Sequence, residues 1–322
     1  MPSGLIRMPL KGKDIISLGD FGRKDIDLVL RTARKLEPIA AKRRRSTLLK
    51  DKILATLFFE PSTRTRLSFE AAMQRLGGGV IGFADPKTSR AGDWRGETLE
   101  DTIKVVDQYA DIIVMRNFIE GTAMTAAKVA DVPVVNAGDG SNEHPTQALL
   151  DLYTILREKK KIDGLTIGLV GDLRNERTFH SMAYGLSNFD VELVYVHPPG
   201  TSLPDPIATR IKEKGLSTTT VSKLEDVIGR LDVLYTDTTR KEAFKDSAEY
   251  EKFHAAYPHI NVKSLENAKE GMIILHPLPR TDGIDFHVEP AVDKTPYALY
   301  FKEVFYGVVT RMAILSLVLG AV

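Results

Sequence analysis

The segment "ILATLFFEPSTRTRLSFEAAMQRLGG" (residues 53–78) decides the fold class of this chain. Its first seven residues are apolar and include branched and aromatic side chains, which is typical of a buried β-strand. Pro61 ends that run, and the residues from Ser62 onward have the composition of a helix. A strand that leads directly into a helix is the building unit of a parallel α/β sheet.

The same alternation of strand and helix recurs along all 322 residues. Helical patterns such as Thr98–Tyr109 and Pro145–Lys159 separate apolar, strand-like runs, and this order predicts parallel sheets with right-handed crossovers. We therefore expect an α/β fold with two doubly wound parallel-sheet domains joined by interdomain helices. The predicted strands are residues 53–59, 78–83, 111–116 and 132–138 in the first half, and 165–172, 191–197, 231–237 and 272–279 in the second.

The length of the chain is sufficient for two domains that each bury a core. We expect a first domain over residues 1–148, a second over 149–300, and a C-terminal helix over 301–322 that packs back on the first. The final segment "MAILSLVLGAV" (312–322) is apolar but shorter than the roughly 18 residues of a membrane span. It is therefore expected to be a helix buried in the core.

Composition excludes several functional classes. The formal net charge is +1, so no overall field attracts the chain to nucleic acid or to a lipid surface, and neither partner is expected. The absence of cysteine excludes disulfides, thiolate nucleophiles and cysteine-based metal sites. The start of the sequence has no long apolar run typical of a signal peptide, so a cytoplasmic protein is expected.

Polar residues gather where the predicted strands end. Ligands of open parallel sheets bind beyond the carboxyl ends of the strands, so these clusters mark a candidate site. They are Pro61–Arg66, Arg116, His144 with Gln147, Asp172–Arg177, Asp237–Arg240 and His276–Arg280.

The cluster Ser62–Thr65 has the features of an anion site. It lies at the start of a helix, where backbone N–H groups without helical partners and the positive end of the helix dipole point outward. Phosphate is the most natural ligand, with hydroxyl donors and the charged fork of Arg64 beside it. The alternative is that Ser62 or Thr63 only caps the helix, with Arg64 and Arg66 in solvent. No P-loop is present and Gly168–Gly171 lacks the dinucleotide-binding spacing, so a nicotinamide cofactor is not expected.

Three further motifs follow "STRTR" in a set order: "NAGDGSNEHPTQALLDLYTI" (136–155), "GDLRNERTFHS" (171–181) and "HPLPR" (276–280). Together they closely resemble the aspartate/ornithine carbamoyltransferase family, and the resemblance covers nearly the whole chain. The form "HPLPR", without a cysteine, resembles the aspartate branch. Members of that branch transfer the carbamoyl group of carbamoyl phosphate to L-aspartate in pyrimidine biosynthesis.

The resemblance implies a role for each part of the carbamoyl phosphate site, in the first domain and in "HPLPR". In related proteins Ser62, Thr63, Arg64 and Thr65 would hold the phosphate, and Arg116 would span the phosphate and the carbonyl oxygen. His144 would donate to that oxygen as the amine attacks, so Arg64, Arg116 and His144 are the catalytic candidates. The carbamoyl NH₂ group would be held by Gln147 and by the backbone carbonyls of Pro277 and Leu278. The chemistry implies no cofactor and no metal.

The amino-acid half of the site departs from the family pattern. The resemblance assigns Arg177 to a carboxylate of the acceptor and implies that Arg95, in a loop reaching into a neighbouring subunit, replaces a lysine. Thr238, Ala243 and Gly283 stand where relatives carry charged residues. In one interpretation, Arg240 supplies the second cation and aspartate is the acceptor. In another the acceptor is a different amine, and a non-catalytic ligand-binding relative is the third alternative.

The neighbour-reaching loop also implies an oligomer. We expect a homotrimer with active sites shared between subunits, and the resemblance leaves open whether regulatory chains bind.

Overall fold

The computed structural model describes residues 10–91, 96–239, 245–280 and 287–322. The chain divides into two compact units. Unit 1 comprises residues 1–150 and 306–322, and unit 2 comprises residues 151–305. The chain passes from unit 1 to unit 2 within helix α5 (Pro145–Lys159) and returns within helix α9 (Tyr300–Val318).

Unit 1 contains a four-stranded sheet in which all strand pairs are parallel. Its strands lie in the order β2-β1-β3-β4. In register, Leu54 of β1 lies between Val80 of β2 and Ile112 of β3. The strands are β1 (Ile53–Phe58), β2 (Gly79–Phe83), β3 (Ile112–Asn117) and β4 (Val134–Asp139).

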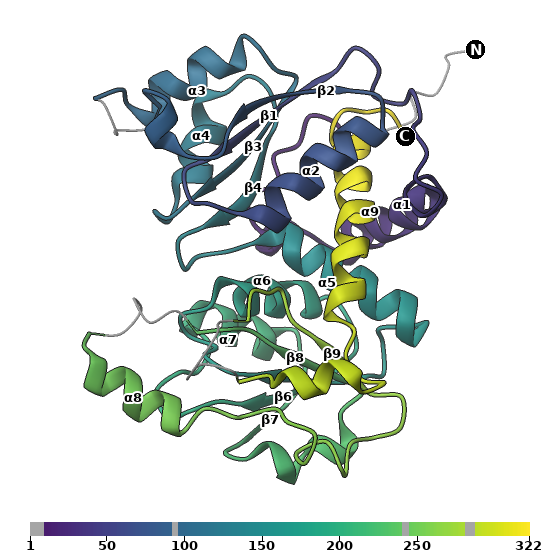
Figure 1. The fold of residues 1–322 in the computed structure, drawn as a ribbon, viewed down its shortest axis with the longest axis vertical. Coiled ribbons are helices and arrows are strands. Elements are labelled where there is room, and N and C mark those ends of the chain that lie inside the picture. The colour runs from purple at the N-terminus through teal and green to yellow at the C-terminus, as the bar shows by residue number, and fades with distance from the viewer. Residues whose placement is uncertain (1–9, 92–95, 240–244, 281–286) are drawn as a thin grey trace. The chain divides into compact units, whose positions relative to one another are not determined.

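Helices cover both faces of this sheet (Figure 1). They are α1 (Arg23–Ala41), α2 (Thr63–Arg75), α3 (Leu99–Asp107), α4 (Thr122–Val129) and the later part of α9. On one face, Leu57 and Met115 of the central strands form a buried core with Ile103 of α3 and Ala126 of α4. The central strands are buried on both faces, which explains their near-continuous apolar runs.

Unit 2 contains a five-stranded parallel sheet in the order β7-β6-β5-β8-β9. Its strands are β5 (Thr166–Val170), β6 (Glu192–Val196), β7 (Ser217–Val221), β8 (Val233–Thr236) and β9 (Ile273–Leu275). The described helices that follow α5 here are α6 (Arg177–Leu186), α7 (Asp205–Glu213) and α8 (Ser247–Ala255). A buried core on this sheet joins Val194 and Leu234 to Val288, Val292 and Tyr300.

The predicted fold class is confirmed, and all eight predicted strands exist with ends shifted by a few residues. The prediction missed β7, so the second group has five strands rather than about four. The sequence of β7 is "STTTV", and every residue of it is exposed or only half-buried at the sheet edge. β7 therefore lacks the apolar run by which the other strands were predicted. Of the expected buried helix over 312–322, Met312–Val318 is buried within α9, whereas residues 319–322 lie beyond the helix and are half-buried or exposed.

Strand order fixes where a ligand can reach each sheet. In unit 1 the connections from β1 lead first outward to β2 and then back to β3, so the order reverses between β1 and β3. In unit 2 the same reversal lies between β5 and β8. Crevices at such reversals, beyond the carboxyl ends of the strands, are the usual ligand sites of open α/β sheets.

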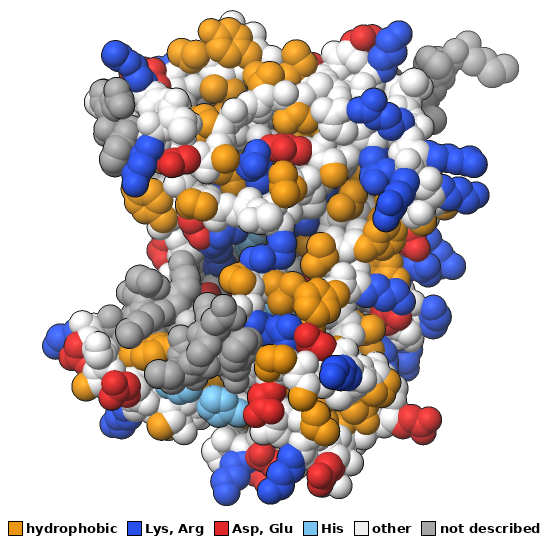
Figure 2. Space-filling model, viewed as in Figure 1, with side chains coloured by type: hydrophobic (Ala, Val, Ile, Leu, Met, Phe, Trp, Pro, Cys, Tyr) orange, Lys and Arg blue, Asp and Glu red, His pale blue; other side chains and the backbone are white. Residues whose placement is uncertain are grey.

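The surface and the helices add two observations. Lys and Arg are interspersed with Asp and Glu among the described side chains on the face shown in Figure 2. Across the described parts of the chain, no helix combines the length and apolar character needed to cross a membrane.

Candidate functional site

The turn after β1 presents the start of α2 at the β1–β3 reversal. Ser62 is the N-cap residue of α2, and its hydroxyl accepts a hydrogen bond from the backbone N–H of Thr65 at 3.3 Å. Ser62 therefore does cap the helix, but its hydroxyl hydrogen can still donate elsewhere. Arg66 is held away in an ion pair with Glu70 at 2.9 Å. Thr63 is exposed and Arg64 half-buried, so both lie within reach of solvent.

Arg116 lies on β3, immediately across the sheet from the end of β1. Phe58 pairs with Arg116 in register, and the carbonyl of Arg116 accepts the N–H of Phe59 at 2.9 Å. The guanidinium donates to the Glu60 carboxylate at 2.5 Å. Glu60, which no sequence motif indicated, thus orients the cation beside the α2 terminus. The two strand ends bring Arg116 and Ser62–Thr65 to the same edge of the sheet.

His144 lies at the start of α5, the third element that contributes to the candidate site. Its carbonyl accepts the N–H groups of Gln147 and Ala148, so it occupies the N-cap position of α5, with Pro145 as the first helical residue. The ring is 4% exposed, and Nε2 lies 3.4 Å from the hydroxyl oxygen of Thr65. Gln147 lies one turn into α5 and is also buried. The helix starts of α2 and α5 therefore converge.

A buried carboxylate holds the loop that leads to His144. Asp139, at the end of β4, is 1% exposed and accepts hydrogen bonds from four donors. These are Asn136 Nδ2 at 2.8 Å, Gly121 N at 2.9 Å, Asn142 Nδ2 at 3.0 Å and Glu143 N at 3.3 Å. A turn with this many satisfied donors has little freedom, so the position of His144 is fixed by its backbone.

Glu143 anchors the other side of this loop. Its carboxylate accepts the hydroxyl of Ser17 and the N–H of Leu18, the latter at 3.1 Å. Both anchors come from a segment more than 100 residues earlier, which explains why local sequence patterns did not reveal Glu143.

In unit 2 the loop after β5 is built around Asp172. This buried carboxylate accepts the backbone N–H groups of Arg174 and Asn175 and the Asn175 side chain, at 2.8–3.2 Å. Burial raises the pKa of Asp172 above its ordinary value, although these hydrogen bonds lower it in part. The loop ends at Arg177, the first residue of α6, which is 6% exposed.

The loop after β8 lies beside that helix start. Asp237 accepts the hydroxyl of Thr178 at 2.6 Å, and its own backbone carbonyl accepts the hydroxyl of Tyr257 at 2.7 Å. Gly171 makes room for this contact, because a Cβ there would lie 2.2 Å from the Tyr257 hydroxyl oxygen. The Thr178–Asp237 hydrogen bond therefore connects the end of the β5 loop to the β8 loop at the second strand-order reversal. Arg177 immediately precedes Thr178.

The segment "HPLPR" follows β9 and is held at several points. The N–H of Leu278 donates to His276 Nδ1 at 2.8 Å, and the hydroxyl of Thr238 donates to the carbonyl of Pro279 at 2.7 Å. Leu278 has a φ of +58°, a left-handed conformation that is unusual for a branched side chain and marks a tightly determined backbone.

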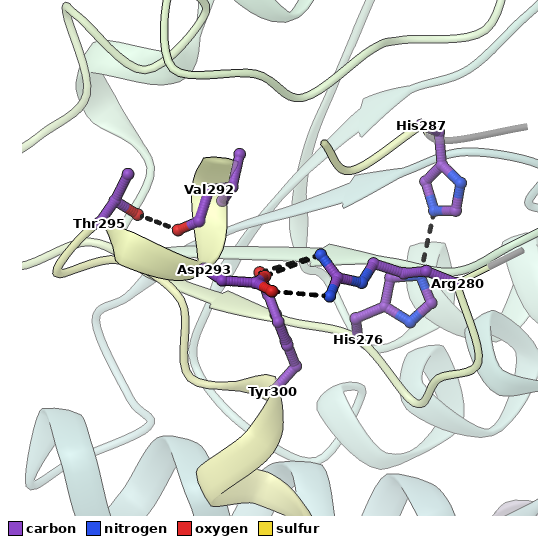
Figure 3. A network of polar contacts seen from close by, with 7 residues as sticks. All are labelled: His276, Arg280, His287, Val292, Asp293, Thr295 and Tyr300. Atoms are coloured by element: carbon purple, nitrogen blue, oxygen red, sulfur yellow. Dashed lines mark hydrogen bonds and ion pairs between the residues drawn. The ribbon is translucent and has the colours of Figure 1, made fainter. Parts of the chain in front are cut away.

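Figure 3 shows how the far end of this segment is secured. Arg280 makes two parallel bonds to the Asp293 carboxylate, at 2.7 and 2.9 Å, and lies over the ring of Tyr300. Tyr300 also donates to Asp293. Burial alone would raise the pKa of Asp293, but the hydrogen bonds from Arg280 and Tyr300 outweigh it and lower the pKa. Arg280 is thus a structural anchor of the loop.

The predicted site residues fall into two groups and a remainder. In unit 1, strand ends and the starts of α2 and α5 carry the predicted residues, and Thr65 contacts His144; they are Ser62, Thr63, Arg64, Thr65, Arg116, His144 and Gln147. In unit 2, Arg177, Pro277 and Leu278 all follow the carboxyl ends of strands. Arg95 and Arg240 lie outside the described residues. Within the described part of the chain, no group of three or more His, Asp or Glu side chains is arranged to hold a metal ion.

Two family models match this chain. The model described as "Aspartate/ornithine carbamoyltransferase, carbamoyl-P binding domain" matches residues 13–157. The model described as "Aspartate/ornithine carbamoyltransferase, Asp/Orn binding domain" matches residues 163–318. Together they account for most of the sequence.

Individual relatives agree with the family models. The "Aspartate carbamoyltransferase catalytic subunit" of Thermococcus onnurineus is 51% identical over 313 residues, covering 97% of this chain and 99% of that protein. Among solved structures, the catalytic subunit of M. jannaschii aspartate transcarbamoylase matches with a TM-score of 0.84 and 48% identity, covering 94% of this chain and 97% of that one. The Trypanosoma cruzi enzyme in complex with carbamoyl phosphate and aspartate matches with a TM-score of 0.88 and 40% identity, covering 96% and 98%.

Proposed function

Because this chain belongs to the aspartate/ornithine carbamoyltransferase family, we propose that it transfers the carbamoyl group of carbamoyl phosphate to the amino group of L-aspartate. The products are N-carbamoyl-L-aspartate and phosphate. The observation that carries the proposal is the convergence of the α2 and α5 helix starts with Arg116 at the β1–β3 reversal. A compact anion with a carbonyl group fits that arrangement.

The phosphate of the substrate would lie at the start of α2. Ser62, Thr63 and Thr65 offer hydroxyl and backbone donors there, and the helix dipole favours negative charge. Arg64 adds a guanidinium that can form charge-assisted hydrogen bonds to phosphate oxygens. Arg116, oriented by Glu60, would bridge the phosphate and the carbonyl oxygen.

His144 would stabilise the charge that develops on the carbonyl oxygen. When the amine attacks, that oxygen becomes an oxyanion, and a donor already in place costs no reorganisation. The buried ring of His144 is held by its N-cap position and by the Asp139 loop. The carbamoyl NH₂ would donate to Gln147 and to the carbonyls of Pro277 and Leu278. The substrate amine attacks directly, so alignment supplies much of the rate.

The acceptor would be recognised by unit 2. Arg177, at the start of α6, would bind one carboxylate of aspartate, and Arg240 would bind the other. Arg95, supplied by a neighbouring subunit, would add a further cation. Arg95 and Arg240 lie outside the described residues, so the role of Arg95 rests on sequence resemblance and that of Arg240 on the need of a dicarboxylate for two cations. We further propose a homotrimer with shared sites, in the cytoplasm, serving pyrimidine biosynthesis.

The test compares two arginines of one loop. Arg177→Ala should raise the KM for L-aspartate by roughly 10- to 100-fold, because a charged hydrogen-bonded contact is worth about 1.5–3 kcal/mol. The KM for carbamoyl phosphate should change little. Arg174→Ala is the matched control, since Arg174 is exposed three residues earlier. Equal aspartate KM values for the two variants would contradict the assignment, and turnover with another amino acid instead would move the acceptor to a different amine.

A further inference from the structure

Two buried histidines of unit 2 meet beside the "HPLPR" segment. His276, the first residue of that segment, is 1% exposed, and His287 is 4% exposed. Their Nε2 atoms lie 3.0 Å apart, their ring centroids 5.1 Å apart, and the angle between the ring planes is 28° (Figure 3). The two nitrogens therefore lie between the centroids, and the rings meet edge to edge. This is the geometry of an N–H···N hydrogen bond, in which one nitrogen donates and the other accepts.

A backbone N–H group decides which ring donates. The N–H of Leu278 can only donate, and it lies 2.8 Å from His276 Nδ1. His276 Nδ1 is therefore the acceptor and carries no proton, so the proton of the neutral ring is on Nε2. It follows that His276 donates through Nε2 and that His287 accepts through its own Nε2.

His287 offers this donor a closer acceptor than the other side chain in contact with it. The hydroxyl oxygen of Thr238 lies 3.5 Å from His276 Nε2, and its hydrogen is directed at the carbonyl of Pro279 at 2.7 Å. A contact of 3.5 Å is weak by comparison with one of 3.0 Å. Removing the acceptor on His287 would therefore weaken the preference of His276 for the tautomer with a proton on Nε2. The other tautomer has its proton on Nδ1 and cannot accept from Leu278.

His287 is itself held from outside the "HPLPR" segment. The N–H of Ile260 donates to the carbonyl of His287 at 2.6 Å. The next residue, Val288, pairs with Ile260 in a parallel bridge and lies in the buried core of unit 2. The ring of Tyr257 meets the His287 ring at 72°, with 5.3 Å between centroids. The accepting nitrogen is thus fixed by the segment that follows α8.

The bond between Leu278 and His276 also orients a carbonyl group. The peptide between Pro277 and Leu278 is trans and planar, so the carbonyl of Pro277 points opposite to the N–H of Leu278. Holding that N–H against His276 Nδ1 therefore aims the Pro277 carbonyl away from the histidine. Leu278 has the left-handed φ of +58°, which persists only where the surroundings hold it.

We propose that His287 is a positioning residue for carbamoyl transfer, because it sets the tautomer of His276 that fixes the peptide between Pro277 and Leu278. The catalytic part of this proposal rests on the proposed function, in which the carbonyls of Pro277 and Leu278 hold the carbamoyl NH₂ group. His287 touches no reacting atom in this account. It acts through His276, by keeping those carbonyls aligned before the substrate arrives.

The test replaces His287 in the full chain with two residues of different hydrogen-bonding capacity. His287→Gln keeps an oxygen that can accept from His276. His287→Phe keeps a ring and its contact with Tyr257 but has no acceptor. His259→Phe is the matched control, since His259 is an exposed histidine of the same unit.

The first readout, solid-state ¹⁵N NMR of protein labelled at histidine, needs no substrate. In the wild type, His276 should show a protonated Nε2 and an unprotonated Nδ1, and its signals are identified by their loss in His276→Asn. His287→Gln and His259→Phe should keep this pattern, whereas His287→Phe should add a protonated Nδ1 signal from His276. A wild-type His276 with its proton on Nδ1, or an unchanged His276 pattern in His287→Phe, would overturn the proposal.

The second readout is kcat/KM for carbamoyl phosphate. His287→Phe should lower it roughly 3- to 10-fold, the effect expected from one hydrogen bond, and His287→Gln should recover most of that loss. His259→Phe should match the wild type. Inhibition by inorganic phosphate should be unchanged throughout, because phosphate has no NH₂ group for the carbonyls to hold. A folded His287→Phe with wild-type kcat/KM would contradict the positioning role.

A second background separates the tautomer from packing. In His276→Asn the side-chain oxygen can accept the N–H of Leu278, two residues on, and no tautomer remains to be set. His287→Phe should then cost much less activity in that background than in the wild type. Equal costs would show that His287 acts through packing and would refute the proposal. Absence of turnover in the wild type would instead refute the proposed function, and the NMR spectra would still decide whether His287 sets the tautomer.

Discussion

Replacing Asp139 tests whether the loop before His144 is held as the structure implies. Asp139→Ala removes a carboxylate that is 1% exposed and serves four donors. Two of these donors, Gly121 N and Asn142 Nδ2, belong to exposed residues and can turn to water. The other two, Asn136 Nδ2 and Glu143 N, are buried and would lose this acceptor, while Asn136 Nδ2 keeps its bond to the carbonyl of Ile16 at 3.0 Å.

The expected magnitude follows from the loss of the carboxylate by those two buried donors. Each such loss costs about 1–3 kcal/mol, so the variant should lose roughly 2–6 kcal/mol of unfolding free energy. For a unit of this size, that corresponds to a fall in Tm of roughly 4–24 °C. Carbamoyl transfer should also slow below the unfolding temperature, because the backbone that positions His144 is loosened.

The assay is thermal unfolding followed by circular dichroism, with kcat measured 15 °C or so below the transition. Asp101→Ala is the control, because Asp101 is exposed and only faces Lys104 at 3.9 Å, so its Tm should shift by less than about 2 °C. A Tm for Asp139→Ala within 2 °C or so of the wild type would refute the reasoning about the two buried donors.

Three further predictions concern other parts of the molecule. His144→Ala should lower kcat by roughly 10²–10³-fold in steady-state assays, with a smaller effect on carbamoyl phosphate KM, because it removes an oxyanion donor; an unchanged kcat would exclude that role. Asp293→Asn should cost about 1–2 kcal/mol in urea unfolding, because it weakens the two-bond contact with Arg280, and an unchanged midpoint would count against it. The hydrogen bond from Arg230 lowers the pKa of Glu192 in the folded protein. The stability that this pair contributes is present above the pKa of Glu192 in the unfolded chain, and it disappears as pH falls through the pKa of Glu192 in the folded protein. The Tm gap between Glu192→Gln and the wild type should therefore close between pH 7 and about pH 3, and a constant gap would contradict this.

The sequence predicted the strands that are buried on both faces. Runs such as Ile53–Phe59 have few polar residues because helices cover both sides of the sheet. The edge strand β7 was missed because its threonines face solvent, so its pattern resembles that of a loop. Propensity for β structure was its only signal, and propensity alone is weak.

The candidate site was predictable where strand ends supply it. Ser62 and His144 follow strands and Arg116 lies near the end of one, and parallel strands bring their carboxyl ends to one edge. The partners that orient these residues were not predictable. Arg116 and Glu60 are 56 residues apart, and Glu143 and Ser17 are 126 residues apart. Such contacts depend on register and packing, which one sequence does not encode in any local pattern.

The most direct test of the account is steady-state formation of the ureido product from carbamoyl phosphate with L-aspartate varied. We predict saturable turnover with an aspartate KM at or below the millimolar range, which is usual for enzymes. Phosphate should be released in equal amount. If carbamoyl phosphate binds but no L-aspartate concentration yields product, the anion site stands and the assignment of aspartate as acceptor is wrong.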